Sequence, residues 1–235
     1  MSYSDVRRRV AFFDVDETLI TAKSMFDFLR FWLDRNGDDG SYYWLLSEQR
    51  RTRAASGVPR EEINRDYYRQ FAGVAKNELW AAGLEWYRDY KLRPDAFIGA
   101  TLAAAAEHRA AGDAIVMVSG SFRACLAPLA ADLGATEVLC SEPIADENGI
   151  LTGEIARPMI GDAKADAVTE TVARMGVSAL DCYAYGDHSS DLKMLLAVGQ
   201  RRVVGDNPVL LAKAHTHGWP ILSAAPVPFS LAAAV

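Results

Sequence analysis

Two aspartates, Asp14 and Asp16, directly follow the first apolar run of the sequence, residues 10–13. A run of this length is typical of a buried strand, and side chains two positions apart on an extended segment point to the same side. Both carboxylates can therefore face one ligand. Because two like charges held together need a cation or a proton to offset them, the pair indicates a magnesium site. The alternative is a surface turn or a helix cap, where this pattern is also common.

Other polar groups follow later apolar runs. Ligands of open parallel sheets bind beyond the carboxyl ends of the strands, so we expect these groups to converge on the first two aspartates. They are Ser119 and Gly120 after the run 114–118, Asp187 after the run 182–185, Lys164 near the start of a helix, and Asp191 one helical turn beyond Asp187.

Such a set fits phosphoryl transfer, which needs a nucleophile, a cation and donors for the phosphate oxygens. Asp14 or Asp16 could attack phosphorus to form an acyl-phosphate, a known use of carboxylate nucleophiles. Asp14 and Asp187 could hold magnesium together with water and the substrate phosphate. The remaining donors are the Ser119 hydroxyl, the Gly120 amide and the fixed positive charge of Lys164.

The elements that carry these groups alternate between helix and strand after residue 93, which indicates a parallel sheet. The strands are continuous apolar runs, as expected when helices cover both faces. We therefore predict a doubly wound, Rossmann-like α/β fold. Strands are expected at 10–13, 114–118, 138–140, 182–185 and 202–204, and helices at 95–111, 122–133, 162–175 and 190–197.

The segment 21–92 differs because it is helical throughout, and we predict that it forms an inserted helical cap domain. Residues 1–20 and 93–235 would form the core domain. The cap helices are expected to begin at 24, with Ser24 as the N-cap, and to continue at 41–55, 61–72 and 76–91. Residues 144–155 read as a small β-hairpin, and the tail after Ser223 is expected to lie loosely on the surface.

With its motifs in this order, the chain resembles the haloacid dehalogenase (HAD) superfamily, in particular its phosphoserine-phosphatase-like branch with a helical cap (subfamily IB). The motifs are residues 14–19, residues 118–121, Lys164 and residues 186–191, within a resemblance that covers about residues 10–222. The resemblance implies a magnesium-dependent phosphatase. It would hydrolyse a small phosphomonoester through an aspartyl-phosphate intermediate.

The resemblance also assigns roles to residues. It implies that Asp14 is the nucleophile and that Asp16 protonates the leaving oxygen and then activates water. The metal ligands would be Asp14, Asp187 and the backbone carbonyl of Asp16. Ser119, Gly120 and Lys164 would bind the phosphoryl group, and Asp191, His188 and Thr18 would support the groups that touch metal and substrate.

One position departs from the phosphoserine phosphatases, which carry an acidic residue for the substrate ammonium group shortly after the first motif. This chain has Lys23 there. A lysine repels an ammonium group and favours an anionic or hydroxyl-rich leaving group, so we expect that phosphoserine is not the substrate. In the last motif, His188 either contacts substrate as a secondary acid or caps the following helix.

Several arginine, aromatic and histidine residues are interpreted as structural rather than functional. We interpret Arg50, Arg51 and Arg53 as a solvated helix face above an aromatic core of Tyr42, Tyr43 and Trp44, and a lid for an anionic or ring-bearing substrate is the alternative. Phe26 and Trp32 are interpreted in the same way. His108, His215 and His217 are expected at the surface.

The composition of the chain argues against several classes of function and location. The net charge of -6 gives no general attraction to nucleic acid or to an anionic membrane. The three cysteines have no C-x-x-C spacing, which favours a reducing cytoplasm, and no apolar run is long enough for a signal sequence or a membrane span. The run Arg7-Arg8-Arg9 is interpreted as a solvated lead-in to the first strand. The expected partner is a small phosphate ester, and the chain is expected to be a monomer or homodimer.

Rival functions remain open. A phosphotransferase or phosphomutase of the same superfamily keeps both aspartates of the first motif. A catalytically silent phospho-ligand-binding protein could keep the fold. A phospho-accepting receiver domain is disfavoured by the long helical insert, a dehalogenase by Asp16, and a P-loop nucleotide hydrolase by the absence of that motif.

Overall fold

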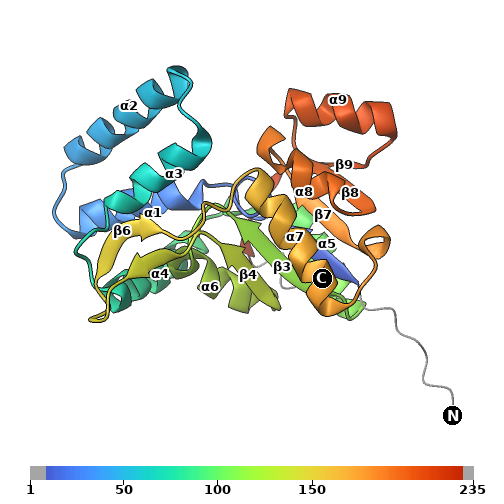
Figure 1. The fold of residues 1–235 in the computed structure, drawn as a ribbon, viewed down its shortest axis with the longest axis horizontal. Coiled ribbons are helices and arrows are strands. Elements are labelled where there is room, and N and C mark those ends of the chain that lie inside the picture. The colour runs from blue at the N-terminus through green and yellow to red at the C-terminus, as the bar shows by residue number, and fades with distance from the viewer. Residues whose placement is uncertain (1–8, 230–235) are drawn as a thin grey trace, which may run out of the picture.

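A computed structural model describes residues 9–229, and its centre is a parallel sheet of six strands in the order β4-β3-β1-β7-β8-β9 (Figure 1). The chain crosses from one half of the sheet to the other beside β1, so the switch point of the topology lies at the carboxyl end of that strand. The strands are β1 (Val10–Phe13), β3 (Ala114–Ser119), β4 (Glu137–Cys140), β7 (Tyr183–Gly186), β8 (Gln200–Val204) and β9 (Ile221–Leu222). The predicted doubly wound α/β fold is confirmed.

Helices cover both faces of the sheet, and alternate side chains of β1 show how. Phe13 packs into one apolar cluster with α5 and α6, whereas Phe12 packs into a second cluster with α7, α8 and α9. Both side chains are fully buried, which explains why the strand reads as a continuous apolar run. The helices are α5 (Gly99–Ala110), α6 (Arg123–Leu133), α7 (Asp162–Met175), α8 (Leu192–Leu196) and α9 (Pro208–His217).

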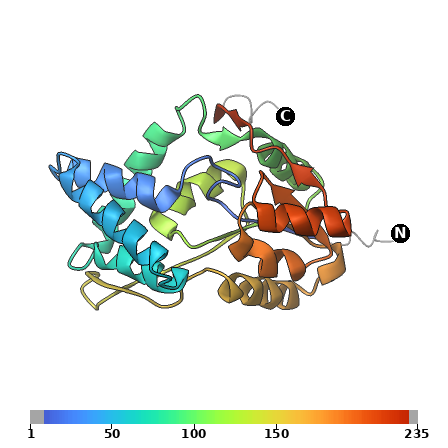
Figure 2. The same cartoon turned by 90° about the horizontal axis from the view of Figure 1, so that it is seen from above.

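The four helices that follow β1 along the chain gather at one side of the molecule, away from the C-terminal elements (Figure 2). They are α1 (Ser24–Arg35), α2 (Ser41–Ala55), α3 (Arg60–Arg69) and α4 (Lys76–Tyr90). Their aromatic interior includes Phe122, which precedes α6, at 5.4 Å from the Phe28 ring. A Cβ on Gly83 of α4 would lie 2.1 Å from the carbonyl oxygen of Ala124, so α4 is packed directly on α6. The cap and core boundaries at 20/21 and 92/93 stay predictions.

The predicted hairpin forms as β5 (Pro143–Ala145) and β6 (Leu151–Ile155). It lies against the helical segment, because the Gly73 amide donates to the Leu151 carbonyl at 2.8 Å and the Leu151 amide donates to the Val74 carbonyl at 2.8 Å. The hairpin therefore ties the connection between α3 and α4 to the remainder of the chain.

Three local expectations were wrong. Residues 97 and 98 form the short strand β2 (Phe97–Ile98) rather than the start of a helix. The tail pairs with it through β10 (Pro226–Val227), and Val227 and Phe229 are partly buried against the core, while residues 230–235 lie outside the described residues. Lys23, and not Ser24, occupies the N-cap position of α1, and the Ser24 hydroxyl donates instead to Ser121 Oγ at 2.8 Å. Arg7 and Arg8 of the arginine run also lie outside the described residues.

His108 was expected at the surface, but it is buried between α5 and the sheet. Its Nδ1 lies 2.7 Å from Asp113 Oδ2 and its Nε2 lies 2.9 Å from the Tyr185 hydroxyl. Arg9 completes the network with an ion pair to Asp113 at 2.9 Å. The sequence pattern missed this because a histidine that satisfies two buried partners looks like any polar residue on a helix.

We expect His108→Phe to lower the free energy of unfolding by about 1–3 kcal/mol, because Asp113 and Tyr185 each lose a buried partner. Urea denaturation at neutral pH measures the change. His215→Phe on the exposed face of α9 is the control and should change stability by less than about 0.5 kcal/mol. Equal stability of the two variants would contradict a structural role for the His108 network.

Candidate active site

The carboxyl ends of β1, β3 and β7 bring three predicted residues into one cavity. Asp14 follows β1, and its amide donates to the Tyr185 carbonyl at 3.0 Å, which continues the pairing of β1 with β7. Ser119 ends β3 and Asp187 follows β7. All three line a cavity of about 330 Å³, together with Asp16, Lys23, Gly120, Lys164, His188 and Asp191. The expected convergence at the sheet edge therefore occurs.

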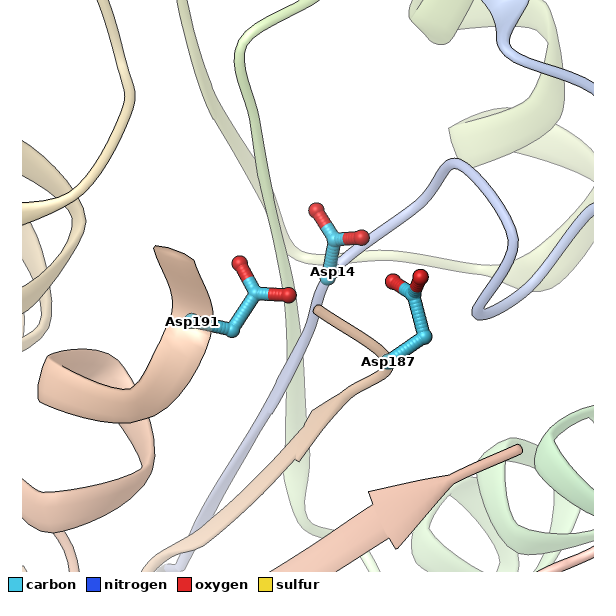
Figure 3. Close-up of side chains that lie close together, drawn as sticks. All are labelled: Asp14, Asp187 and Asp191. Carbon is cyan, nitrogen blue, oxygen red and sulfur yellow. The ribbon is translucent and has the colours of Figure 1, made fainter. Parts of the chain in front are cut away.

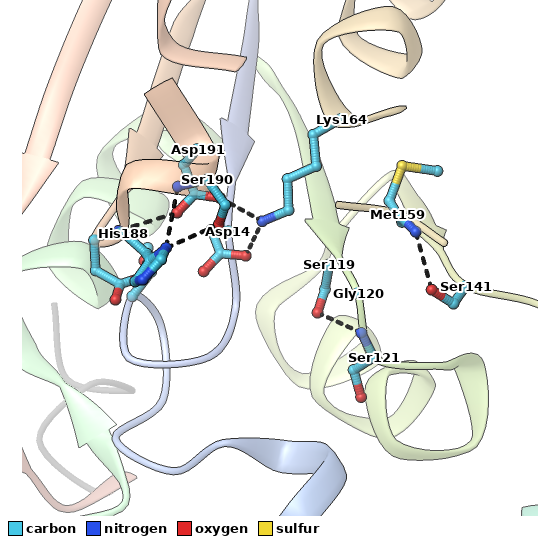
Figure 4. A network of polar contacts seen from close by, with 12 residues as sticks. Asp14, Ser119, Gly120, Ser121, Ser141, Met159, Lys164, His188, Ser190 and Asp191 are labelled. Carbon is cyan, nitrogen blue, oxygen red and sulfur yellow. Dashed lines mark hydrogen bonds and ion pairs between the residues drawn. The ribbon is translucent and has the colours of Figure 1, made fainter. Parts of the chain in front are cut away.

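Lys164, from the first turn of α7, reaches between two of these carboxylates (Figure 4). Its Nζ donates to Asp14 Oδ1 and, at 2.7 Å, to Asp191 Oδ1. The side chain is buried, which alone would lower the pKa of Lys164, but the charges of Asp14 and Asp191 outweigh burial and raise it. Lys164 is thus a permanent cation beside Asp14.

Asp14, Asp187 and Asp191 each place a carboxylate oxygen within 4.8 Å of the others, and Figure 3 shows the three groups around one space. Burial, followed by the charges of Asp14 and Asp191, raises the pKa of Asp187 to about 8. Burial also raises the pKa of Asp14, although Lys164 opposes this. Thr18 orients the cluster because its hydroxyl donates to Asp187 Oδ1 at 3.0 Å.

This cluster fits a divalent cation of the hard, oxygen-binding type. Its three carboxylates outnumber the one lysine among them, and burial together with the neighbouring carboxylates raises the pKa of Asp14 and of Asp187. Asp191 accepts through both oxygens, from Lys164 Nζ at Oδ1 and from the His188 amide at Oδ2, whereas Lys164 contacts only Oδ1 of Asp14. Asp14 and Asp187 are therefore the members best able to coordinate a cation. The assignment of the Asp16 carbonyl as a further ligand stays a prediction.

Asp16 is placed differently from Asp14. It lines the same cavity, but its side chain is not a member of the carboxylate cluster. Its Oδ1 is buried and has no hydrogen-bond partner among the described residues. Burial raises the pKa of Asp16 to about 7, Ser24 opposes the shift by hydrogen bonding, and the charge of Asp14 adds to it. A carboxyl group that exchanges its proton near neutral pH suits general acid and base chemistry.

The loop after β3 is held by residues of α3 that the sequence motifs did not reveal. The Gly120 carbonyl accepts from Asn64 Nδ2 at 2.9 Å and from the Tyr68 hydroxyl at 3.0 Å. A Cβ on Gly120 would lie 3.0 Å from the Ile160 side chain, so the loop also needs a small residue there. Ser119 Oγ accepts from the Ser121 amide at 3.1 Å. The helical insert thereby fixes the loop that faces Asp14.

Basic residues of the insert form the other side of the cavity. Lys23, Arg50 and Arg60 all line it. Lys23 is paired with Glu17 at 3.2 Å, so its charge is partly matched by a residue that the sequence interpretation overlooked. Glu17 has φ 60°, an uncommon conformation for a residue with a side chain.

The structure shows the second of the two interpretations of His188, the helix cap, while contact with substrate stays a prediction. Its Nδ1 accepts from the Ser190 amide at 3.0 Å and caps the short helix Ser189–Asp191. Its ring also lines the cavity, where Arg60 Nη1 lies 2.7 Å from Nδ1 and 3.1 Å from Nε2. Burial, and then the charge of Arg60, lowers the pKa of His188.

The interpretation of α2 as a solvated face above an aromatic core was wrong in two respects. Arg50 lines the cavity, and its guanidinium lies 4.1 Å from the centre of the Phe26 ring. Tyr42 and Trp44 are exposed rather than packed in a core. Trp32 of α1 is buried as expected, and His215 and His217 are exposed as expected. Helical periodicity alone does not show which side of an insert faces the core of the molecule.

Comparisons with known proteins agree with this geometry. The family model described as haloacid dehalogenase-like hydrolase matches residues 11–196. A protein of Mycobacterium tuberculosis (strain ATCC 25618 / H37Rv) named "Probable phosphatase" is 41% identical over 118 residues, which is 50% of this chain and 41% of that protein. A phosphoserine phosphatase of the same strain is 28% identical over 223 residues, covering 90% of this chain and 69% of that protein. The chain thus spans less than half the length of the first of these relatives.

Solved structures show the same fold. A protein of unknown function from Bordetella pertussis Tohama I has a TM-score of 0.82 and 27% identity, covering 92% of this chain and 99% of that one. A substrate-bound phosphoserine phosphatase has a TM-score of 0.66 at 17% identity, covering 92% of each chain, and shares the fold.

None of the helices in residues 9–229 has the length and apolar character needed to cross a bilayer. The expected resemblance is confirmed, and the chain belongs to the haloacid dehalogenase-like hydrolase family.

Proposed function

We propose that this protein is a magnesium-dependent phosphatase that hydrolyses small phosphomonoesters through an aspartyl-phosphate on Asp14. The observation that carries the proposal is the arrangement around Asp14. This carboxylate lies at the switch point of the sheet and accepts a hydrogen bond from the buried Lys164. It also belongs to the same carboxylate cluster as Asp187. The names of the relatives and the family membership support the same reaction class.

In this proposal Asp14 attacks phosphorus, so that an Asp14 O–P bond forms as the ester P–O bond breaks. Asp16 gives a proton to the leaving alcohol oxygen. It then takes a proton from water, whose oxygen attacks phosphorus, releases inorganic phosphate and restores Asp14. The pKa of about 7 for Asp16 suits both directions of proton transfer near neutral pH.

The phosphoryl oxygens would be bound by the Ser119 hydroxyl, the Gly120 amide and the Lys164 ammonium group. Magnesium would be held by Asp14 and Asp187 with the Asp16 carbonyl, and would supply positive charge to the phosphoryl group. Asp191 would keep Lys164 in place, and Thr18 would keep Asp187 in place. His188 would link this region to Arg60.

The leaving group would face the insert, where Lys23, Arg50 and Arg60 supply basic side chains. This composition supports a substrate other than phosphoserine, because an ammonium group on this side of the cavity would meet three cations, of which Lys23 is paired with Glu17. A cytoplasmic location and a monomeric or homodimeric state stay predictions.

The direct test is hydrolysis of p-nitrophenyl phosphate by the purified protein with magnesium chloride, compared with the same protein after chelation. We expect turnover that depends on the metal and returns when magnesium is restored. A panel of phosphorylated amino alcohols, sugars, polyols and nucleotides then ranks substrates, with phosphoserine expected to be poor. Absence of turnover on every ester at saturating magnesium would refute the proposed function.

We expect magnesium binding to weaken about tenfold per pH unit below about 8, since Asp187 must lose its proton to coordinate the ion. The stability of the metal-free protein depends on pH in the opposite direction. The pKa values of Asp16 and Asp187 are raised on folding, to about 7 and about 8, so metal-free stability should fall as pH rises from about 4 to 8.

Magnesium reverses this loss, so the rise in melting temperature on adding magnesium should be larger at pH 8.5 than at pH 6. Thermal melts with and without the ion at both pH values measure this. The control is Asp187→Asn, which should lose most of the magnesium effect at both pH values. An equal magnesium shift at pH 6 and pH 8.5 in the unmodified protein would contradict Asp187 as a ligand.

A further inference from the structure

A second cavity of about 300 Å³ lies within the insert, between α1, α2 and α3. Helix α2 forms one wall of it and contains no fully buried residue. Figure 1 shows α2 at the outer end of the insert, away from the sheet. The side chains that line this cavity and not the catalytic cavity include Leu29, Leu46 and Ser47.

The second cavity adjoins the catalytic cavity. Phe26, Arg50, Ile63 and Tyr67 line both. The division between the two spaces therefore consists of a few side chains, among which Arg50 lies over the Phe26 ring with its Cζ 4.1 Å from the ring centre. Arg50 has no carboxylate partner among residues 9–229, whereas Arg53, one turn later on α2, is paired with Asp66 at 2.8 Å. A long side chain without an ion pair can shift at little cost and open the division.

The second cavity offers an apolar contact surface, which consists of Phe26, Leu29, Leu46, Ile63 and the ring of Tyr67. The charged side chains beside this surface pair mainly with one another: Asp66 forms ion pairs with Arg53 at 2.8 Å and with Arg69 at 2.7 Å, although its buried Oδ2 has no hydrogen-bond partner among the described residues. The Tyr67 hydroxyl donates to the Met25 carbonyl at 2.7 Å, which leaves the face of its ring for contact. Recruiting these groups to a ligand would break existing bonds, so burial of apolar ligand surface is the favourable interaction.

We propose that the second cavity receives the apolar end of the substrate's leaving group. This inference rests on the proposed function and gives its substrate class: a phosphomonoester of an alcohol that carries an apolar chain or ring. The phosphoryl group would lie at Asp14 and Lys164, the polar middle of the substrate would pass Arg50, and the apolar end would contact Leu46 and Ile63. Together the two cavities have the size of a small-molecule site, which a phosphate alone does not need.

The test uses n-alkyl phosphates from ethyl to octyl, each below its micelle concentration. We expect kcat/KM to rise by about two- to fourfold per methylene over part of the series, because each buried methylene contributes up to about 0.8 kcal/mol. Leu46→Trp and, independently, Ser47→Phe should fill the second cavity and flatten the dependence. Leu45→Trp is the matched control, because Leu45 is exposed on the same helix and lines neither cavity.

The outcomes separate this inference from the proposed function. Ethyl phosphate, whose leaving group is the shortest in the series, should be hydrolysed equally by the unmodified protein and all three variants. If that activity is present but the chain-length series is flat, or if both cavity-filling variants keep the dependence of Leu45→Trp, the second cavity is not a substrate site. If no ester is hydrolysed, the proposed function fails. Titration calorimetry with the same alkyl phosphates then tests whether the second cavity binds their apolar chains. Affinity that rises with chain length supports binding there, and constant affinity overturns it.

Discussion

Asp14→Asn should abolish turnover of p-nitrophenyl phosphate, by about four orders of magnitude or more, without unfolding the protein. An amide in place of the carboxylate cannot form the acyl-phosphate. Folding should survive because burial raises the pKa of Asp14, which means that its charge is disfavoured in the fold, and Lys164 keeps Asp191 as a partner. Phosphate release at saturating magnesium and urea denaturation measure the two effects.

The matched control is Asp16→Asn, two residues along the same segment. This variant should slow both steps by about 10²–10⁴ while it keeps magnesium binding, because only its backbone carbonyl is expected on the metal. Its pH–rate profile should also lose the limb near the pKa of about 7 assigned to Asp16. Asp14→Asn with retained turnover would remove the assignment of the nucleophile. Asp16→Asn with unchanged turnover would remove the assignment of the proton donor.

The core of the site was predictable from the sequence because it depends on strand ends. Asp14, Ser119 and Asp187 each follow an apolar run, and parallel strands place their carboxyl ends at one edge. Lys164 was found for a related reason, since a lysine in the first turn of α7 must lie near the same edge. Local pattern and topology were sufficient for these residues.

The residues that the sequence did not reveal come from contacts between distant elements. Asn64 bonds the Gly120 carbonyl across 56 positions of the chain, and Arg60 reaches His188 across 128. A helical pattern predicts that α3 has a buried face, but it does not predict what that face covers. The same limit explains Arg50, whose burial against Phe26 depends on how α2 lies over α1.

Lys164→Met should produce the largest combined loss of stability and activity. The ammonium group is the cation that balances Asp14 and Asp191, and all three side chains are buried. Removing one partner of a buried ion pair costs about 3–5 kcal/mol, because the remaining charges stay uncompensated. Turnover should fall by at least about 10²-fold, since a donor to the phosphoryl group is also lost.

The stability loss should depend on pH in a defined direction. Without Lys164, the opposite charge that lowers the pKa of Asp14 is gone, so this pKa rises further and the carboxyl group takes up a proton more readily. The deficit relative to the unmodified protein should therefore shrink as the pH falls from 8 to 5.5. Urea denaturation at the two pH values gives the comparison, and a constant deficit would contradict an electrostatic origin.

A double-mutant cycle separates charge from packing. Asp14→Asn in the Lys164→Met background removes one of the uncompensated carboxylates, so the double variant should be more stable than Lys164→Met alone. Asp34→Asn, at an exposed position of α1 outside the catalytic cavity, is the control and should not restore stability. If both second substitutions act alike, the loss in Lys164→Met comes from its missing side-chain contacts. Restoration by Asp14→Asn alone would instead identify Lys164 as the cation that makes it possible to bury the nucleophile beside two further carboxylates.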